Sequence, residues 1–201
     1  MILTGARISL RPVTAGDVAR LSSIRREPEV ASRWGGLGEG EIEEEFVGND
    51  KVFVVETEWE VIGAIQYDEE EDPMYRHASI DIFLTTARHG QGLGPEAIRL
   101  LARYLIDERG HHRMTIDPAA DNGAAIRAYE KVGFRRVGVM RSYERGPDGT
   151  WHDGRRCSRT NSRAMDRALL KTPRPSSGAV SWSSASCGSS CSGRCASRRS
   201  C

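Results

Sequence analysis

A glycine-rich turn stands directly before a helical pattern and has the composition of an anion-binding site. The turn consists of Arg88, His89, Gly90, Gln91, Gly92, Leu93 and Gly94. A helix N-terminus exposes unpaired N–H groups and a partial positive charge, and glycines let the backbone approach a phosphate closely. Alone the turn is a weak signal, because many glycine-rich loops are only turns. The chain lacks the Gly-Lys-Ser/Thr of a P-loop, and no suitably placed acidic residue supports a dinucleotide fold.

Two motifs, in this order, resemble the GNAT (Gcn5-related) N-acetyltransferase family. Residues 88–94 are similar to its acyl-CoA pyrophosphate loop, and residues 121–134 (DNGAAIRAYEKVGF) to its next motif, with a helix and a strand between them. The resemblance covers roughly residues 7–154. Within the family the chain is most similar to the bacterial aminoglycoside 6′-N-acetyltransferases, through residues 69–73, 80–84 and 115–118. One departure is His89, where the family usually has Gln or Arg.

The resemblance implies a fold, a co-substrate and a cofactor site. The fold is α/β (α+β), with a central mixed, mostly antiparallel sheet that is splayed in the middle and flanked by helices. The co-substrate is acetyl-CoA, and we expect no metal. The residues expected to bind the cofactor are Leu84, His89, Gly90, Gln91, Gly92, Leu93, Gly94 and Asn122. For Asn122 a plain helix N-cap is the alternative, and both roles are compatible.

The implied reaction is direct acetyl transfer, in which the amine must reach the thioester neutral. Asp117 ends a predicted strand where the family's splayed sheet admits the acyl group, and we assign it as the general base, directly or through water. Asp81 alternates with Ile80 and Ile82 and is assigned to substrate binding. Without the resemblance, Asp81 would be interpreted as a solvent-facing strand residue and Asp117 as a turn residue before Pro118.

Tyr129 matches the family's candidate general acid, which protonates the departing CoA thiolate. With a phenolic pKa of ~10, above that of a thiol, it is expected to donate as the thiolate forms. The alternative is a core aromatic on the apolar face of its helix.

Acidic and aromatic residues suggest the acceptor. Glu70, within the run Glu69 to Asp72, can present a carboxylate to a polyamine-like substrate, although such a run is usually a solvated loop. Trp34 can line the substrate cleft, although a buried Trp is more common. We therefore expect acetylation of an amine on a small polycationic substrate, with the 6′-amine of an aminoglycoside antibiotic as first candidate.

The positioning elements follow from periodicity. Alternation predicts strands at 7–13, 52–58, 61–67, 77–84, 112–117 and 134–143, with a tight turn near residues 59–60. Helix spacing and caps predict helices at 14–26, 41–47, 95–109 and 122–133. Residues 34–40 are expected to form a glycine-rich loop and residues 68–73 an acidic connection.

Composition excludes several classes. The chain has 201 residues and a formal net charge of +1, which suits one globular domain. The segment from Pro173 onward holds four Arg and no Asp, Glu or Lys, so the body is mildly acidic and nucleic acid is disfavoured as a partner. No apolar run reaches the ~20 residues of a membrane span, and Arg7 interrupts any signal-peptide pattern, so we expect a cytoplasmic protein. We expect it to be a monomer or a homodimer.

The segment after Gly154 departs from the family, which continues with an apolar strand. We expect residues 1–154 to form the acetyltransferase domain and residues 155–201 a divergent, disordered Ser/Arg/Cys-rich tail. Its composition is typical of an alternate reading frame of GC-rich DNA, so a frameshift near residue 154 is one hypothesis and a genuine divergent tail the other. Cys187, Cys191 and Cys195 recur every fourth residue, but without His nearby they are interpreted as incidental.

Two alternatives to the aminoglycoside hypothesis remain open. One is a GNAT enzyme for another amine or hydroxylamine, such as a siderophore precursor or a protein N-terminus. The other is a non-catalytic acyl-CoA-binding domain.

Overall fold

The computed structural model describes residues 1–58 and 60–161, which are organised around one eight-stranded sheet. The strands follow the order β1-β2-β3-β4-β5-β6-β8-β7. Their bounds are β1 Leu3–Thr4, β2 Ser9–Pro12, β3 Val52–Glu56, β4 Val61–Glu70, β5 His77–Leu84, β6 Arg113–Ile116, β7 Arg135–Arg145 and β8 Trp151–Thr160. Neighbouring strands are antiparallel, except that β5 and β6 are parallel. The expected mixed, mostly antiparallel sheet is confirmed.

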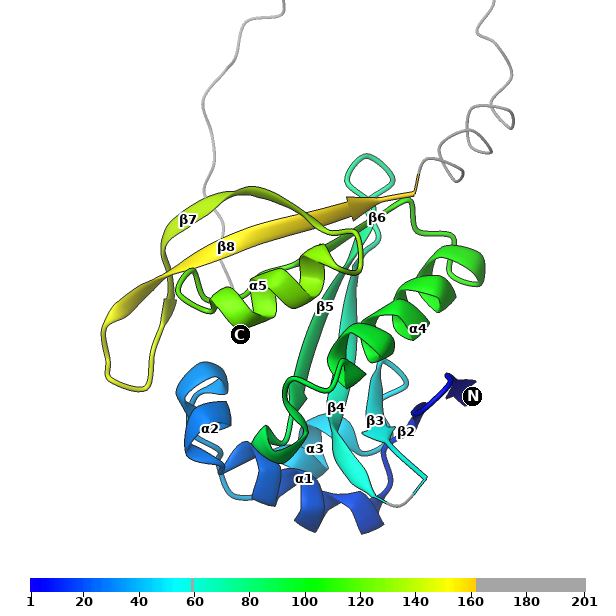
Figure 1. Cartoon of the computed structure of the whole chain (residues 1–201), viewed down its shortest axis with the longest axis vertical. Coiled ribbons are helices and arrows are strands. Elements are labelled where there is room, and N and C mark those ends of the chain that lie inside the picture. Colours follow the sequence, from blue (N-terminus) through cyan, green and yellow to red (C-terminus); the bar gives the residue numbers. More distant parts are fainter. Residues whose placement is uncertain (59, 162–201) are drawn as a thin grey trace, which may run out of the picture.

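Helices flank this sheet, as Figure 1 shows. They are α1 Val18–Arg25, α2 Pro28–Trp34, α3 Glu41–Phe46, α4 Leu93–Asp107 and α5 Gly123–Glu130, with short 3-10 turns η1 Ala15–Asp17 and η2 Thr86–Arg88. The sequence analysis missed α2, although Pro28 at its first position is a recognised start signal. Among these helices none is both long and apolar enough to cross a membrane.

Strand β5 separates two hydrophobic cores because its side chains alternate. Ile80 packs with α4 and with Met114 of β6 in the larger core. Phe83 faces the other side and packs in the smaller core with α1 and α3. Leu101 on α4 is completely buried, and each side chain of this kind stabilises the fold by about 1.5–3 kcal/mol. The two cores therefore hold β5 in place between two layers of helices, and this fixes the position of Asp81 on the strand.

The acidic connection expected at residues 68–73 is corrected. Residues 68–70 belong to β4, and the Glu69 side chain is only 3% exposed. Its carboxylate accepts hydrogen bonds from Arg109 Nη2 at 2.8 Å and His111 Nε2 at 2.7 Å. The Arg109 hydrogen bond, opposed by burial, lowers the pKa of Glu69 to about 2. The Glu69 carboxylate therefore stabilises the fold, because Arg109 and His111 already occupy its oxygens.

The expected boundary after Gly154 is also corrected. Residues 155–160 continue β8, which lies between β6 and β7 and pairs with both. Cys157 is 1% exposed and packs in the larger core. The other residues of this segment can be polar, because the backbone hydrogen bonds that hold a strand in a sheet do not depend on side chains. The expected disorder and Cys187, Cys191 and Cys195 lie outside the described residues.

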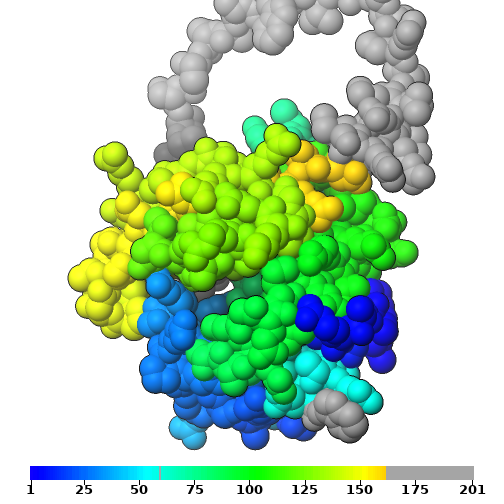
Figure 2. Space-filling view, viewed as in Figure 1, coloured from blue at the N-terminus to red at the C-terminus, as the bar shows by residue number. Residues whose placement is uncertain are grey.

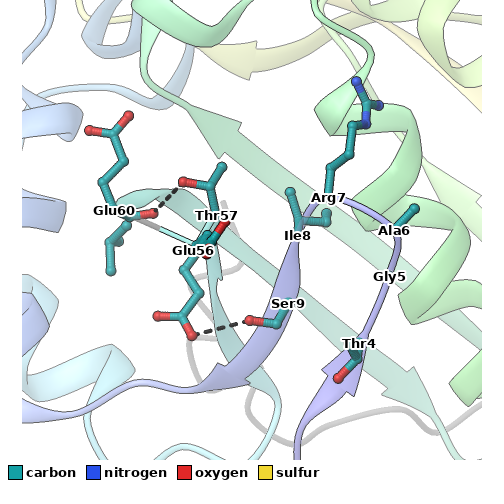
Figure 3. A pocket seen from close by; sticks show the side chains of 11 residues that line it. Thr4, Gly5, Ala6, Arg7, Ile8, Ser9, Glu56, Thr57 and Glu60 are labelled. Atoms are coloured by element: carbon teal, nitrogen blue, oxygen red, sulfur yellow. Dashed lines mark hydrogen bonds between the residues drawn. The ribbon is translucent and has the colours of Figure 1, made fainter.

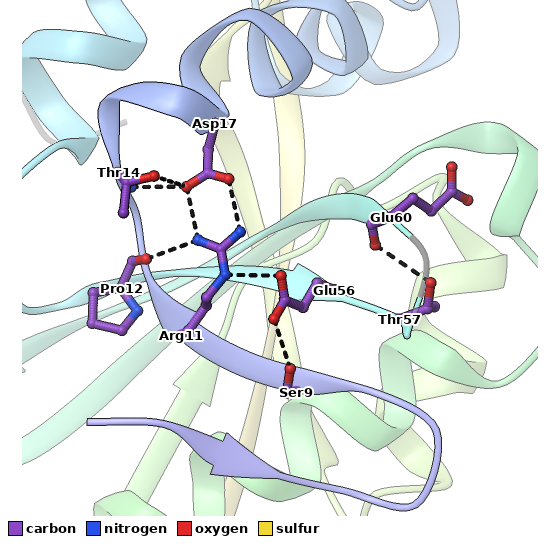
Figure 4. A network of polar contacts seen from close by, with 8 residues as sticks. All are labelled: Ser9, Arg11, Pro12, Thr14, Asp17, Glu56, Thr57 and Glu60. Carbon is purple, nitrogen blue, oxygen red and sulfur yellow. Dashed lines mark hydrogen bonds and ion pairs between the residues drawn. The ribbon is translucent and has the colours of Figure 1, made fainter.

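A polar network ties the start of the chain to the sheet (Figure 4). Arg11 on β2 donates to both oxygens of Asp17 at 2.8 Å and to Glu56 of β3 at 2.8 Å. Asp17 also accepts the Thr14 amide and hydroxyl, and these two residues form a capping box at the start of η1. Asp17 is therefore buried with its charge compensated, and its pKa is held far below the usual range by Arg11.

Candidate active site

Asp81 and Asp117 lie on the two sides of the gap between β5 and β6. These strands pair through only two residue pairs, the last being Ser79 with Thr115, and then separate. Each Asp is two residues beyond that pair, so the two side chains lie at the same level and on the same face of the sheet. This is the face of Phe83, opposite the face of α4.

The environment of Asp81 favours proton exchange near neutral pH. The residue is partly buried on β5, opposite Gln66 of β4. Burial first, and the charge of Asp117 second, raise the pKa of Asp81 to about 6, while the Gln66 side chain acts in the opposite direction. A carboxylate with this pKa is ionised at pH 7 and still basic enough to accept a proton.

Asp117 is held by two donors. Arg156 of β8 donates from Nε to Oδ1 at 3.1 Å and from Nη2 to Oδ2 at 2.7 Å. The Tyr143 hydroxyl of β7 donates to Oδ2 at 3.2 Å. The hydrogen bond to Asp117 raises the pKa of Arg156, which therefore stays charged. Both carboxylate oxygens of Asp117 are engaged.

Tyr129 reaches the same region from α5. Its side chain is buried and lines a cleft between the helices. Burial first, and the negative charge of Asp81 second, raise the pKa of Tyr129 above the ordinary phenolic range. The phenol is therefore protonated at neutral pH and can act as a hydrogen-bond donor.

The glycine-rich turn borders this cleft, which has a volume of about 610 Å³. Figure 2 shows the surface hollowed between α2, in blue, and the green segments. Gly90 and Gly92 have φ of 75° and 79°, a left-handed conformation that favours glycine. Gly92 is the N-cap of α4, and Leu93 and Gly94 begin the helix at the cleft wall. The N-terminus of α4 thus faces an open space, as an anion site requires.

The charges of the cleft are strongly one-sided. One carboxylate residue, Glu29, lines it among the described residues. The basic residues lining it are Arg7, Arg33, Arg88, Arg99, Arg127 and Lys131. Arg7, Arg33 and Arg88 are paired with carboxylates outside the lining, and the other three cations provide the excess charge. This excess attracts a polyanion, and coenzyme A carries a pyrophosphate and a ribose phosphate.

Two residues that the sequence analysis missed hold the turn. Arg7 donates from Nη1 to the Gln91 carbonyl at 2.9 Å and forms an ion pair with Glu96 of α4 at 2.9 Å. Glu27 accepts the Thr85 hydroxyl at 2.6 Å and the Thr86 amide at 2.8 Å. The turn is therefore fixed at both ends before any ligand binds.

A second hollow lies beside Arg7 and contains Glu56 and Glu60 (Figure 3). Figure 3 shows Arg7 extending away from both carboxylates. Glu56 is bound by Arg11 and Ser9, and Glu60 by Arg88. These pairs compensate the acidic charge of the hollow, which is separate from Asp81.

Most of the remaining predicted residues line the cleft. Leu84, His89, Asn122 and Trp34 line the cleft, and Asn122 also caps α5 by accepting the Ala125 amide at 3.1 Å. The Leu84 carbonyl is engaged by His89 Nε2 at 3.0 Å. Gln91 contributes its carbonyl to Arg7 and its side chain to the Ala87 carbonyl.

Among the predicted residues, Gln91, Asp81 and Asp117 are absent from the cleft lining, and Glu70 lies apart from both the cleft and the two aspartates. It pairs with His77 at the start of β5, four residue pairs along β4 from Gln66 and Asp81. Its carboxylate is exposed and accepts the Asp72 amide at 3.0 Å.

Charge pairs far apart in sequence carry no local signal, which is why Arg7, Glu27 and Arg156 were missed. Arg33 of α2 also belongs to this group, because it pairs with Asp121, next to Asn122, at 2.5 Å. In the described residues no three His, Cys, Asp or Glu side chains gather in a way that could hold a metal ion.

Comparisons with known proteins agree with this geometry. The family model described as "Acetyltransferase (GNAT) domain" matches residues 7–135. The chain is 29% identical over 164 residues to an aminoglycoside N(6′)-acetyltransferase type 1 of Klebsiella pneumoniae, covering 71% of this chain and 79% of the relative.

Two solved structures share the fold. The aminoglycoside acetyltransferase AAC(6′)-Ib, in complex with paromomycin and acetyl-CoA, aligns at a TM-score of 0.64 and 25% identity, covering 83% of this chain and 100% of that one. The spermidine N-acetyltransferase of Vibrio cholerae, in complex with CoA and spermine, aligns at 0.69 and 21% identity, covering 80% and 99%. With a helix N-terminus, a cationic cleft and the family match combined, the chain belongs to the GNAT acetyltransferase family and is an acetyl-CoA-dependent N-acetyltransferase.

Proposed function

We propose that this enzyme acetylates an amine of a small polycationic acceptor, with the 6′-amine of an aminoglycoside as first candidate. The observation that carries the proposal is that positive and negative side chains occupy two different places in the site. Basic residues line the cleft at the start of α4, and Asp81 and Asp117 lie together at the gap between β5 and β6. The relative that acts on aminoglycosides supports the acceptor class.

Asp81 is the general base in this proposal, whereas the sequence alone favoured Asp117. The acceptor amine binds as an ammonium ion and must lose a proton to become nucleophilic. Asp81 accepts this proton, and its pKa of about 6 suits the task. Asp117 is engaged by Arg156 and Tyr143 and is therefore assigned to acceptor binding and positioning.

Transfer then forms a C–N bond and breaks the C–S bond of the thioester, and the proton that the nitrogen loses as the amide forms passes through water to the released thiolate. Negative charge develops on the departing sulfur, and the Tyr129 hydroxyl donates a hydrogen bond to it. Complete proton transfer from Tyr129 would be unfavourable, because a thiol has a pKa of ~8.5 and that of Tyr129 is raised. Its contribution is therefore stabilisation of charge and not delivery of a proton, which revises the role expected from the resemblance.

The co-substrate fits the described residues. The amides at the start of α4 and the glycine-rich turn would hold the pyrophosphate of acetyl-CoA, and the basic wall of the cleft its remaining phosphate. Asn122 and Leu84 line the path from that end toward Tyr129. Acetyl-CoA is an intracellular metabolite, so we propose that the enzyme works in the cytoplasm.

The extent of the catalytic domain is part of the proposal. Residues up to Thr160 complete the sheet, so we propose that the domain ends near residue 160. A change of reading frame near residue 154 remains a separate hypothesis, which rests on the composition of the segment that follows. Sequencing the gene tests the latter: an apolar, strand-like continuation in the other frame supports a frameshift, and its absence rules the idea out.

Thiol release from acetyl-CoA tests the function with a panel of acceptors. The panel contains an aminoglycoside with a 6′-amine, one with a 6′-hydroxyl, a polyamine and a peptide, and mass spectrometry identifies each product. We expect rapid release with the 6′-amine and little with the 6′-hydroxyl. Preference for the polyamine or the peptide would reassign the acceptor, and no release despite acetyl-CoA binding would contradict the catalytic proposal.

A further inference from the structure

The strongest feature that the mechanism leaves unused is the ion pair between Arg156 and Asp117. Arg156 approaches the carboxylate with two nitrogens, Nε to Oδ1 at 3.1 Å and Nη2 to Oδ2 at 2.7 Å. Two parallel N–H···O bonds are the strongest geometry that an Arg–carboxylate pair adopts. The pair joins β8 to the residue that follows β6.

The position of this pair connects it to the acceptor. Asp117 lies level with Asp81, which is the proposed general base and also feels the charges of Asp68 and Glu144. The Asp117 side chain is 15% exposed and the Arg156 side chain 40%, so the guanidinium is accessible to solvent. An acceptor that reaches from Asp81 to Asp117 therefore meets the charge of Arg156 at the second carboxylate.

We propose that Arg156 is a specificity-determining residue, an internal cation that occupies Asp117 and limits how many positive charges the bound acceptor can place there. This inference rests on the proposed function and assigns a role to a residue on the segment after Gly154.

The physical basis is competition between two cations for one carboxylate. A second ammonium group of a polycationic acceptor must displace Arg156 or share Asp117 with it, and like charges at short range repel. A monoamine that uses Asp81 alone does not compete. Arg156 therefore reduces, without abolishing, the advantage that a second ammonium group gives a polycation over a monoamine at these two carboxylates.

Three variants separate this role from a structural one. Arg156→Gln removes the charge and retains hydrogen-bonding atoms, and Arg156→Lys retains the charge. Arg136→Gln is the matched control, because Arg136 on neighbouring β7 forms an exposed ion pair with Glu130 at 2.7 Å and is outside the site. Thermal melting and acetyl-CoA affinity establish that each variant is folded.

The measurement is KM and kcat for a monoamine and for an acceptor with four or more ammonium groups. We expect Arg156→Gln to lower KM for the polycation by about tenfold, the effect of one charge-assisted hydrogen bond, and to leave that for the monoamine within about twofold. Arg136→Gln should behave like the unmodified enzyme, and Arg156→Lys, which keeps the charge but not the pair of parallel bonds, should lower KM for the polycation by less than Arg156→Gln does. An equal effect on both acceptors, or a higher KM for the polycation, would overturn the proposal.

Calorimetry with spermine in the absence of acetyl-CoA separates this inference from the proposed function. If no acceptor is acetylated but Arg156→Gln binds spermine about tenfold more tightly, the function fails and the inference stands. If transfer occurs and spermine affinity is unchanged by Arg156→Gln, the inference fails and the function stands. Unchanged affinity without transfer contradicts both.

Discussion

Asp81 and Asp117 are each two residues beyond the last paired residues of β5 and β6, level with one another on the two sides of the gap that opens there. Their surroundings differ. Asp81 has burial and the Asp117 charge acting against its ionised form, whereas Asp117 has Arg156 and Tyr143 as donors. Two carboxylates at one level of the sheet therefore have different surroundings, which is the basis for the different tasks that we propose for them.

The pH dependence of transfer should report Asp81. Because its pKa is raised to about 6 and only the ionised form accepts a proton, kcat/KM should rise with pH below about 6 and become level above it. Asp117→Asn removes the second cause of the shift and should move this limb to lower pH. It should not reach the ordinary Asp value of ~3.9, because burial, the larger cause, remains. A limb that stays in place or moves upward would argue against this electrostatic coupling.

Loss of the Tyr129 hydroxyl should affect the chemical step. Tyr129→Phe retains the buried ring, and we expect kcat to fall by about tenfold to a hundredfold with acetyl-CoA affinity unchanged. Rapid-quench measurement of the first turnover isolates this step. Tyr104→Phe, on α4 and away from the cleft lining, is the control, and equal effects of the two changes would remove Tyr129 from the mechanism.

Arg7 should matter for acetyl-CoA through the turn it holds. Arg7→Gln loses the bond to the Gln91 carbonyl and the ion pair with Glu96, so KM for acetyl-CoA should rise by about fivefold to tenfold. KM for the amine should change little. Arg103→Gln on α4 serves as the control for charge, since Arg103 does not line the cleft. A change in the amine KM alone would contradict this role.

Asp17 should contribute to stability and not to activity. Asp17→Asn weakens its bonds to Arg11 and Thr14, and we expect a loss of about 2 kcal/mol in the free energy of unfolding at pH 7. The folded-state pKa of Asp17 is lowered, so this contribution is present above the unfolded value of ~3.9 and is lost as pH falls further. Urea unfolding at two pH values, with exposed Asp107→Asn as control, measures it. An equal effect for both variants would show that the network is dispensable.

Local patterns predicted much of this fold. The alternation of residues 77–84, the helical spacing after Gly92 and the cap at Asn122 are all confirmed. Helix α2 was missed because Pro28 is its single start signal and the segment has no apolar periodicity. The continuation of β8 past Gly154 was missed because its pairing with β6 and β7 is non-local and its side chains include several Arg.

The residues of the proposed site could be chosen from the sequence where their place depends on their own element. Asp81, Asp117 and Tyr129 follow from strand and helix positions together with the family resemblance. The way Arg156 engages Asp117 depends on two strands that meet only in the folded sheet, and no spacing in the sequence encodes it. The proposal of Asp81 in place of Asp117 as general base therefore rests on contacts that only the folded sheet shows.

The rate of acetyl transfer by Asp81→Asn tests the central claim most directly. Asp68→Asn, an exposed carboxylate on neighbouring β4, is its control. We predict that Asp81→Asn loses about 10²–10⁴ in kcat with acetyl-CoA affinity intact, while the control keeps its activity. Transfer by Asp81→Asn at the rate of the unmodified enzyme would contradict the assignment of Asp81 as the base that makes the acceptor amine nucleophilic.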